Sequence, residues 1–435
     1  MLAVLGILTI ALLLVLVMTK KASPVVALII VPIVMALIGG FGADITKFVT
    51  DGVKSIATTG VMFIFAILFF GVLTDAGTFQ PIIKGILKVV GRDPAKITLG
   101  TALLAMLVHL DGSGAVTFLV VIPAMLPLYD ALKMKRTTLA TVTALAAGTM
   151  NIVPWGGPTI RAATSLNIPV TDLFKPVLVP LVFGLVFVFV VSYWLGLKER
   201  KALALSGASA DASQLGGELA MDADKRALMR PRLFPVNIVL IVAAIAVLIQ
   251  GKVPPHVVFM AAFCLALVIN YPKVKDQGAR VDAHAKAALM MASILFAAGA
   301  FTGILKGTGM IKAMADLLVS VIPASLGARF PLITGVLAMP LSLVFDPDSF
   351  YFGVLPVLSS TAAEFGAQAV DVARAAILGQ MTTGFPVSPL TGSTFLLIGL
   401  AGVDLGEHQK KTIPLAFATT LVMLLVAVVI GVIPL

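Results

Sequence analysis

The sequence predicts an all-α polytopic membrane protein made of two inverted repeats, and three observations support this prediction. Hydrophobic residues make up 59% of the 435 positions and charged residues only 12%, whereas charged residues are about 25% of a soluble domain. Several apolar runs of about twenty residues are long enough to cross a hydrocarbon core about 30 Å thick. Finally, features of the first half recur in the same order roughly 235 residues later.

Three membrane crossings are expected first, at residues 2–19, 24–42 and 56–74. The first run has neither a basic segment before it nor a small-residue cleavage pattern after it, so we expect a retained helix and not a signal peptide. Cys264, the only cysteine, falls in a later apolar run. A single cysteine excludes an intramolecular disulfide and a cluster of thiolate metal ligands.

A hairpin and a broken helix are expected next. Residues 97–131 form an apolar stretch that is too long for one crossing and too short for two, with the turn sequence DGSG at its middle. We therefore expect a re-entrant hairpin. Residues 137–170 are interrupted by NIVPWGGPT, which predicts a helix broken inside the membrane, and residues 175–196 supply a closing crossing. Non-helical backbone at membrane depth requires protein or a water-filled cavity around it.

The second half predicts the same series of elements. They are crossings at 234–250, 255–270 and 287–305, a hairpin at 330–360 around DPDS, a broken helix at 369–402 around FPVSPLTGST, and a closing crossing at 412–434. When the halves are aligned, tip acids and Pro-x-x-Gly positions coincide, namely Asp111 with Asp346, Pro154 with Pro389 and Gly157 with Gly392.

These coincidences set the expected domain boundaries. Each half has five crossings, and an odd number inverts the second half relative to the first. We expect a first repeat at 1–197, a polar and mobile cytoplasmic linker at 198–233, and a second repeat at 234–435. Inverted repeats with discontinuous helices are typical of secondary transporters.

The charge distribution predicts the orientation. The net charge of +10 could indicate nucleic-acid binding, but most of the 31 lysines and arginines lie in loops on one side of the expected map. Positive loops face the cytoplasm, so we expect ten crossings, both termini outside, a plasma membrane of the bacterial inner-membrane type and no nucleic-acid partner. The run GEHQKK after the second broken helix is interpreted as a solvated cytoplasmic cap.

Asp111 in the first tip has two interpretations. It can cap the second helix of the hairpin, or it can hold a cation or proton, because a carboxylate inside a membrane costs about 2.5 kcal/mol or more unless it is paired or solvated. Ser113 could cap the same helix without a charge, which favours the coupling role. Asp346 and Asp348 in the second tip repeat the argument, and together they could share a divalent ion or a proton.

The remaining candidates lie beside the tips and breaks. An imidazole titrates near pH 6.5, which suits proton coupling by His109, although a packed histidine is the other interpretation. Arg161 could clamp a substrate carboxylate in a bidentate pair or act as the counter-ion of Asp111. Helix N-termini at the tips favour anions. Further residues at the tips and breaks could bind substrate or form hydrogen bonds with backbone groups that the breaks leave unpaired. They are Ser113, Gly114, Asn151, Gly156, Gly157, Thr159, Ser349, Ser388, Thr391, Gly392, Ser393 and Thr394.

Long motifs then resemble a known family. The stretches MTKKASPVVALIIVPIVMALIGGF, FAILFFGVLTDAG, LDGSG, NIVPWGGPTIRAA, FYFGVLPVL and STFLLIGLAGVDLGEHQ resemble the citrate–metal:proton symporter family, of CitMHS type, within the ion-transporter superfamily. The resemblance covers nearly the whole chain. It implies proton-coupled uptake of citrate complexed with a divalent cation (Mg²⁺ or Ca²⁺), an elevator-type movement and a homodimer, with no covalent cofactor. It also implies a binding region at residues 111–114, 151–161, 348–350 and 388–394.

Both tips depart from the family pattern, which leaves alternatives open. Family members often carry a second acid in the first tip, where this chain has Ser113, and S-N-D in the second tip, where it has DPD. A sodium- or proton-coupled carrier of free di- or tricarboxylates is therefore one alternative. A cation/proton antiporter or channel is an alternative of another class. We do not expect an enzyme, because neither HExxH nor a paired Ser/His/Asp arrangement occurs.

Overall fold

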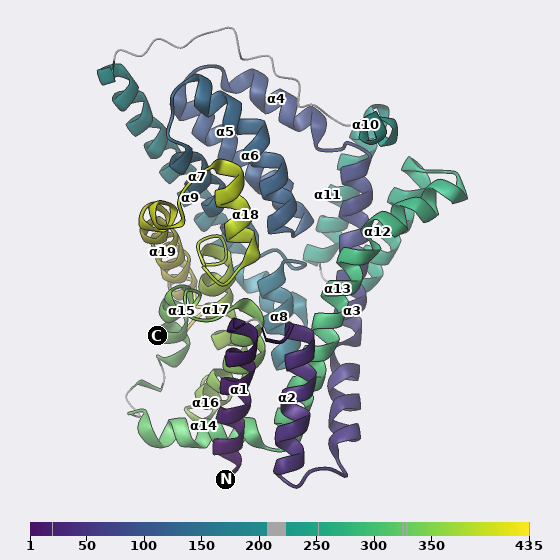
Figure 1. Cartoon of the computed structure of the whole chain (residues 1–435), viewed down its shortest axis with the longest axis vertical. Helices are drawn as coiled ribbons and strands as arrows, with labels where there is room; N and C mark the ends of the chain where they lie inside the picture. Colours follow the sequence, from purple (N-terminus) through teal and green to yellow (C-terminus); the bar gives the residue numbers. More distant parts are fainter. Residues whose placement is uncertain (20, 207–222, 251, 324–325, 328, 435) are drawn as a thin grey trace.

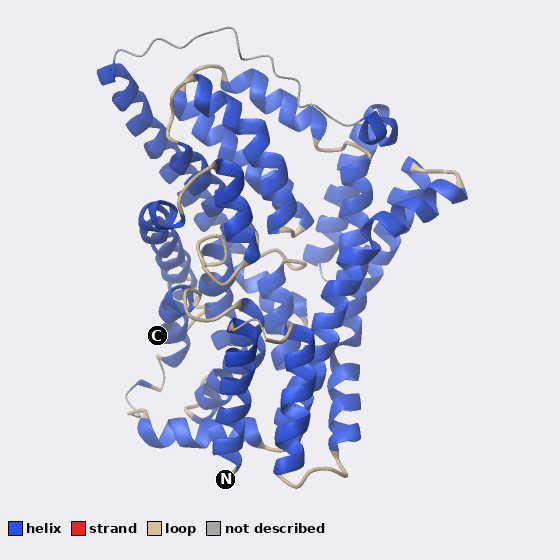
Figure 2. Cartoon of the chain, in the orientation of Figure 1, coloured by secondary structure: helices blue, strands red, loops and turns tan. Residues whose placement is uncertain are grey.

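The computed structural model describes residues 1–19, 21–206, 223–250, 252–323, 326–327 and 329–434, and all regular secondary structure in these ranges is helical (Figure 2). The first half contains α1 (Leu2–Met18), α2 (Pro24–Ile38), α3 (Ile45–Asp75), α4 (Gln80–Val90), α5 (Pro94–Val108), α6 (Gly114–Ala131), α7 (Arg136–Met150), α8 (Gly157–Leu166) and α9 (Val170–Ser206). After the short α10 (Ala223–Leu228), the second half contains α11 (Phe234–Gln250), α12 (Pro255–Asn270), α13 (Val274–Gly307), α14 (Met310–Val321), α15 (Phe330–Leu341), α16 (Leu355–Glu364), α17 (Ala369–Thr383), α18 (Gly392–Ala401) and α19 (Leu405–Val429). The expected all-helical fold class is confirmed.

The helices include several that suit a lipid bilayer. In the described residues, six are long and apolar enough to cross a membrane, in α3, α6, α9, α11 with its preceding turn, α13 and α19. Shorter apolar helices are α1, α2, α12, α15 and α18. Large apolar side chains on several of these helices are exposed, among them Val190 on α9 and Leu425 on α19. Exposed apolar side chains along spanning helices face lipid, so the chain is a multi-pass membrane protein.

Helices α3 and α13 lie side by side through a line of glycines (Figure 1). A Cβ atom on Gly52 would lie 2.1 Å from the carbonyl oxygen of Gly299, and one on Gly303 would lie 2.3 Å from a carbonyl oxygen of α3. Small residues allow helix backbones to approach this closely in membranes. Both helices are longer than the sequence predicts, since they start at Ile45 and Val274 and the crossings were expected from residues 56 and 287.

The helices α4 and α14 were not predicted. Each follows one of the long helices, α3 or α13, and leads to a hairpin. In α4, Lys84 and Lys88 are exposed whereas Ile86 and Val90 are buried. Such a two-sided helix is typical of the membrane surface. Both helices are too short for a crossing, which is why a search for long apolar runs misses them.

The two hairpins and the two helix breaks occupy equivalent places in the two halves. The chain turns between α5 and α6 at residues 109–113, and between α15 and α16 at residues 342–348, where a π-helical turn (Ser349–Val354) follows. The helix α7 ends at Met150 before α8 begins, and α17 ends at Thr383 before α18 begins. The order of elements is therefore the same in both halves, while the inversion relative to a membrane stays a prediction.

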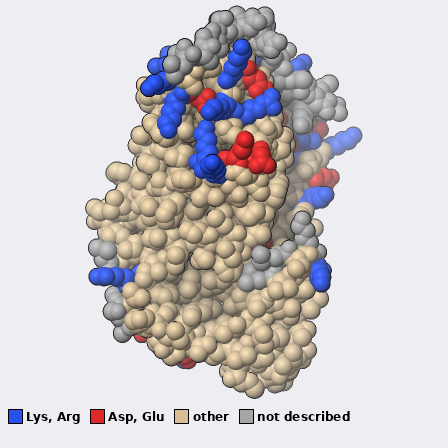
Figure 3. Space-filling view, turned by 60° about the vertical axis from the view of Figure 1, so that its left-hand side comes forward, with Lys and Arg blue, Asp and Glu red and all other residues tan. Residues whose placement is uncertain are grey.

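Basic side chains gather at one end of the molecule. Figure 3 shows them near the part of the chain drawn in grey at the top, above a broad surface without charged side chains. At this end α9 continues to Ser206, so the first residues of the predicted linker are helical. Residues 207–222 of that linker lie outside the described residues.

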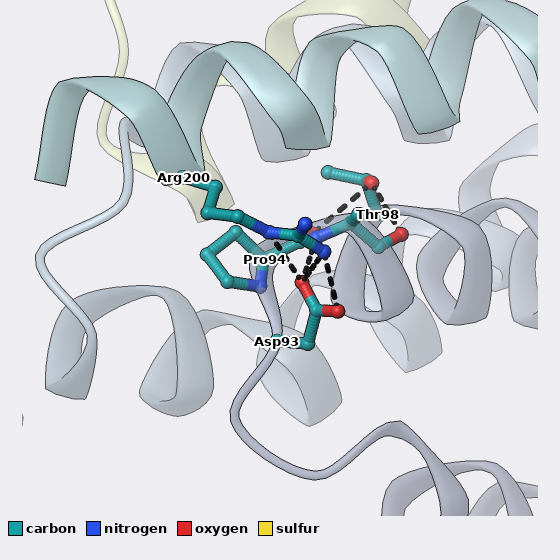
Figure 4. A network of polar contacts seen from close by, with 5 residues as sticks. Asp93, Pro94, Thr98 and Arg200 are labelled. Atoms are coloured by element: carbon teal, nitrogen blue, oxygen red, sulfur yellow. Dashed lines mark hydrogen bonds and ion pairs between the residues drawn. The ribbon is translucent and has the colours of Figure 1, made fainter. Parts of the chain in front are cut away.

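An ion pair joins α9 to the start of the first hairpin at this basic end. The guanidinium of Arg200 donates to Asp93 Oδ1 from Nη2 at 2.6 Å and from Nε at 3.1 Å (Figure 4). The same carboxylate oxygen accepts the Ala95 N–H at 3.0 Å and so caps α5. One carboxylate therefore fixes both the helix start and its position against α9.

Candidate functional site

The first tip is a tight turn in which the roles of serine and aspartate differ. Ser113 is the N-cap of α6, because its Oγ accepts the Val116 N–H at 3.3 Å. Asp111 Oδ1 accepts the Ser113 N–H at 2.8 Å across Gly112, whose φ of +75° favours glycine. The serine caps the helix, as expected if Asp111 has another role. In the described part of the chain, no basic side chain lies within ion-pair distance of Asp111.

Asp111 also lines a small cavity. The cavity has a volume of about 30 Å³ and lies between the tip and the turn that joins α3 to α4, where Thr74 and Gln80 contribute polar groups. A cavity needs about 10–15 Å³ of such space to hold one water molecule. The carboxylate therefore has room beside it for a water molecule or for a small ion.

His109 is fully buried behind the first tip. Its Nδ1 lies 2.8 Å from the hydroxyl oxygen of Thr117 on α6, and its ring stacks on Phe385 of the second break at a centroid distance of 6.1 Å. The side chain of Asn151, at the end of α7, lies beside the same imidazole. His109 thus joins the hairpin to both helix breaks.

The second tip is organised by Asp346. Its Oδ1 accepts the N–H groups of Asp348 at 3.0 Å and Ser349 at 3.2 Å, and its Oδ2 accepts the Ser349 hydroxyl. Both oxygens of Asp346 are therefore engaged in holding the turn. The π-helical turn that follows is buried, and π-helical turns often occur at functional sites.

Arg161 pairs with the second tip. Its Nε donates to Asp348 Oδ1 at 2.7 Å, and the two side chains are only 11% and 13% exposed. This contact joins α8 in the first half to the tip in the second half, so the structure places Arg161 beside Asp348 and not as the counter-ion of Asp111. Only Nε is used in this pair, and the terminal nitrogen Nη1 lies over Gly157, 2.8 Å from where a Cβ would be.

The first break is held by backbone contacts. Gly156 is required because a Cβ there would lie 2.0 Å from the Asn151 carbonyl oxygen. The Thr159 hydroxyl donates to the Ile152 carbonyl at 2.7 Å, across the break. Trp155 Nε1 donates to the Leu110 carbonyl of the first tip at 2.7 Å. The break is thereby fixed to the first tip.

The second break is held in a similar way. The hydroxyls of Thr391 and Thr394 donate to the Phe385 carbonyl at 2.6 and 2.8 Å, and they lie 2.8 Å from each other. Ser388 Oγ donates to the Ser342 carbonyl at 2.6 Å, which joins the break to the second tip. The two threonine hydroxyls therefore pair with a carbonyl of the broken segment, and the Ser388 hydroxyl pairs with a carbonyl of the second tip.

His408 supports the second break from α19. It is fully buried, and its Nε2 lies 2.9 Å from the Pro386 carbonyl oxygen, while Gln409 Nε2 donates to the Val387 carbonyl at 2.9 Å. The interpretation of the GEHQKK run as a solvated cap is wrong for His408. His408 lies on the buried side of α19, in contact with the backbone of the second break.

The tips and breaks converge on one region. A Cβ on Gly114 at the first tip would lie 2.6 Å from the Phe385 ring and 3.5 Å from Ser393 Oγ in the second break. The helices α8 and α18 begin at Gly157 and Gly392, and neither start has a side-chain cap. Their first N–H groups are therefore available to an anion. In the described residues, no group of three or more His, Cys, Asp or Glu side chains could hold a metal ion.

Two aromatic residues belong to this region, and only Phe385 lies outside the binding region expected from the sequence, since Trp155 falls within residues 151–161. Trp155 stacks on Phe70 of α3 at a centroid distance of 5.6 Å and meets Phe259 of α12 edge-on at 5.4 Å. Phe385 lies against His109 and Phe118 of the first hairpin. The only signal in the sequence is that each aromatic residue lies inside a Gly- and Pro-rich break, where a large ring needs a packing partner.

Comparisons with known proteins agree with this architecture. Residues 13–379 match the family model described as Citrate transporter, CitMHS. A protein of Bacillus subtilis (strain 168) named Citrate transporter is 46% identical over 433 residues, covering 100% of both chains. Another protein of that organism, named Mg(2+)/citrate complex secondary transporter, is 40% identical over 432 residues, covering 99% of each.

A solved structure shares the fold. The YdaH transporter of Alcanivorax borkumensis superposes with a TM-score of 0.59 at 13% sequence identity, and the match covers 90% of both chains. At this level of identity the likeness concerns the arrangement of helices alone.

Proposed function

Since the chain belongs to the CitMHS family of citrate transporters, we propose that it is a secondary active transporter that carries citrate with a divalent cation, driven by protons. The observation that carries the proposal is the convergence of both tips and both breaks around Arg161, Asp348 and Asp111. A fixed cation and two unneutralised helix N-termini favour a polycarboxylate, and a tip carboxylate favours a cation.

Arg161 is proposed to bind a carboxylate of citrate. Its Nε is engaged by Asp348, and its terminal nitrogens are the donors left for a substrate. The uncapped starts of α8 at Gly157 and α18 at Gly392 would hold the other carboxylates through backbone N–H groups. Unwound helices with such N-termini bind anionic groups in other secondary transporters.

Asp111 is proposed to contact the cation that travels with citrate. It is a tip carboxylate that does not cap the following helix and that lines a cavity of about 30 Å³. Mg²⁺ is commonly bound by one or two protein carboxylates together with substrate oxygens and water. Citrate would supply several of those oxygens, so one protein carboxylate beside the bound complex suffices.

Asp348 is proposed to take the coupling proton. The Arg161–Asp348 pair is neutral as a unit, so a citrate carboxylate bound to Arg161 would leave one excess negative charge in a buried region. A proton on Asp348 offsets the negative charge that binding adds, and burying an unbalanced charge is costly. Proton uptake and citrate binding would then favour each other. Asp346 is proposed to stabilise the turn at the second tip, because both of its carboxylate oxygens accept hydrogen bonds from the turn.

Further parts of the proposal rest on the family resemblance and on the placement of the basic side chains. We propose that hairpins and broken helices move together past α3 and α13 in an elevator-type motion, in a homodimer of the bacterial inner membrane. The basic end would face the cytoplasm and both termini the outside. The second candidate, a sodium-coupled carrier of free carboxylates, is favoured by the hydroxyl and carbonyl oxygens that gather at Thr391, Thr394 and Phe385.

The test is uptake of labelled citrate into proteoliposomes under an imposed pH gradient, with and without EDTA, Mg²⁺, Ca²⁺ and Na⁺. Asp111→Asn is compared with Asp130→Asn, which removes an exposed acid at the other end of the same hairpin. We expect uptake to require a divalent ion and the gradient, and to be lost only in Asp111→Asn. Uptake that needs Na⁺ and ignores EDTA would favour the second candidate. No citrate uptake under any condition would overturn the substrate assignment.

A further inference from the structure

A basic pocket of about 320 Å³ lies between the start of α7, the end of α9 and the start of α19, away from the tips and breaks. Three lysines line it, one from each segment: Lys135, Lys198 and Lys411. Its acidic group is Glu199. Three cations against one carboxylate give the pocket an excess of positive charge, and the citrate site does not include any of these residues.

Glu199 is held by donors that are not the lysine ammonium groups. Its Oε2 accepts the backbone N–H of Lys135 at 3.2 Å, and its Oε1 accepts the Thr138 hydroxyl. The Lys411 ammonium donates to the same Thr138 hydroxyl, and the Lys198 ammonium lies over the Trp194 ring, 3.5 Å from its centroid. In the described residues, no carboxylate lies within 4 Å of the Lys135 or Lys198 ammonium groups. These positive charges are available to an anion.

The other wall of the pocket is apolar and continues into the lipid-facing surface. Trp194, Leu195, Pro414 and Leu415 form this wall, and Trp194 is 44% exposed. Exposed apolar side chains of α9 run from Val179 through Val190 to Trp194. Tryptophan is typical of the boundary between hydrocarbon and headgroups. An occupant must therefore combine an anionic group with an apolar part.

We propose that this pocket binds the phosphate headgroup of an anionic phospholipid such as phosphatidylglycerol. The phosphate would lie among the three lysine ammonium groups, and the acyl chains would run along the apolar face of α9. Basic pockets between transmembrane helices bind anionic headgroups in other membrane proteins. A soluble anion would gain from the lysines but not from the apolar wall.

Trp194 provides the readout, because it lies in the pocket while the other tryptophan, Trp155, is buried among aromatic rings. Quenching of its fluorescence would be measured in phosphatidylcholine bilayers containing increasing amounts of brominated phosphatidylglycerol. Brominated phosphatidylcholine in place of the anionic lipid measures random contact. We expect quenching by the anionic lipid to saturate at a low mole fraction, and quenching by the neutral lipid to rise steadily.

The variant Lys135→Gln/Lys198→Gln removes two exposed charges, and Lys84→Gln/Lys88→Gln on α4 is its matched control. One lysine near a membrane surface is worth about 1 kcal/mol, or about fivefold in affinity. The pocket variant should therefore need about 25-fold more anionic lipid for half-maximal quenching, and the control should resemble the parent protein. Both variants should melt at the parent temperature, because these side chains are exposed.

Three results would overturn the proposal. The first is equal quenching by the anionic and neutral lipids. The second is an equal loss of binding in the two double variants, which would indicate general charge attraction without a defined pocket. The third is displacement of the lipid by millimolar glycerol phosphate, or the same change in Trp194 emission with glycerol phosphate alone. That result would mean that the pocket binds a free phosphate and not a lipid.

Discussion

The ion pair between Arg161 and Asp348 gives a quantitative test of how the two halves are joined. The atoms Nε and Oδ1 are 2.7 Å apart, and the side chains are 11% and 13% exposed. Two unit charges about 4 Å apart in an effective dielectric constant of about 20 attract by about 4 kcal/mol. Removing one partner of a buried pair costs about 3–5 kcal/mol, because the other charge stays buried without compensation.

A double-mutant cycle with Arg161→Gln and Asp348→Asn should therefore be strongly non-additive. We expect each single variant to lose about 3 kcal/mol of unfolding free energy and the double variant to lose far less than the sum, with a coupling energy of about 2–3 kcal/mol. The assay is reversible unfolding in mixed micelles with increasing SDS, followed by fluorescence. Citrate uptake by each variant is measured in parallel, and all three should have lost it.

The matched control is the ion pair between Arg136 and Asp130 at the other end of the first hairpin, where the side chains are 46% and 41% exposed. Its atoms are also 2.7 Å apart, but an exposed pair should show a coupling energy below about 1 kcal/mol. Effects of the Arg161 and Asp348 substitutions that add within about 0.5 kcal/mol would refute the reasoning. They would mean that the two side chains do not interact in the folded protein.

Other predictions concern the breaks and the basic end. Gly156→Ala should abolish citrate uptake, because its Cβ would lie 2.0 Å from a carbonyl oxygen, whereas Gly399→Ala, with open space around it, should stay within about twofold of the parent. Trp155→Phe loses a 2.7 Å hydrogen bond to the first tip and should lower the unfolding free energy by about 1–3 kcal/mol in the same SDS titration. The hydrogen bonds from Arg200 lower the pKa of Asp93. The Arg200–Asp93 pair therefore stabilises the folded protein fully above the ordinary aspartate pKa of about 3.9, and this stabilisation is lost as pH falls through the lowered pKa. Asp93→Asn should therefore lower the unfolding free energy by less than about 1 kcal/mol at pH 7, and should have no effect once the carboxyl of the parent protein is protonated. Thermal unfolding measured across pH tests this. Equal uptake by the two glycine variants, an unchanged free energy for Trp155→Phe, or a pH-independent effect of Asp93→Asn would contradict the respective argument.

Features that depend on short stretches of chain could be predicted from the sequence. Apolar run length specifies which helices can cross a bilayer, since the hydrocarbon thickness is fixed. Turn and break positions follow from glycine and proline, as at Gly112 with its φ of +75° and Gly156 with no room for a Cβ. The choice of Ser113 as the helix cap is also local, because a hydroxyl three residues before an N–H reaches it within one turn.

Tertiary structure alone decided which distant groups meet. Arg161 pairs with Asp348, which is 187 positions away, and Phe385 packs against Gly114 and His109 of the other half. The full lengths of α3 and α13 and the short two-sided helix α4 also became visible only in the packed structure. Periodicity and turn chemistry act over a few residues, whereas these contacts depend on how whole helices pack. The sequence therefore identified the acids and the arginine, and only the packed helices showed that Arg161 serves the second tip and leaves Asp111 free of a basic partner among the described residues.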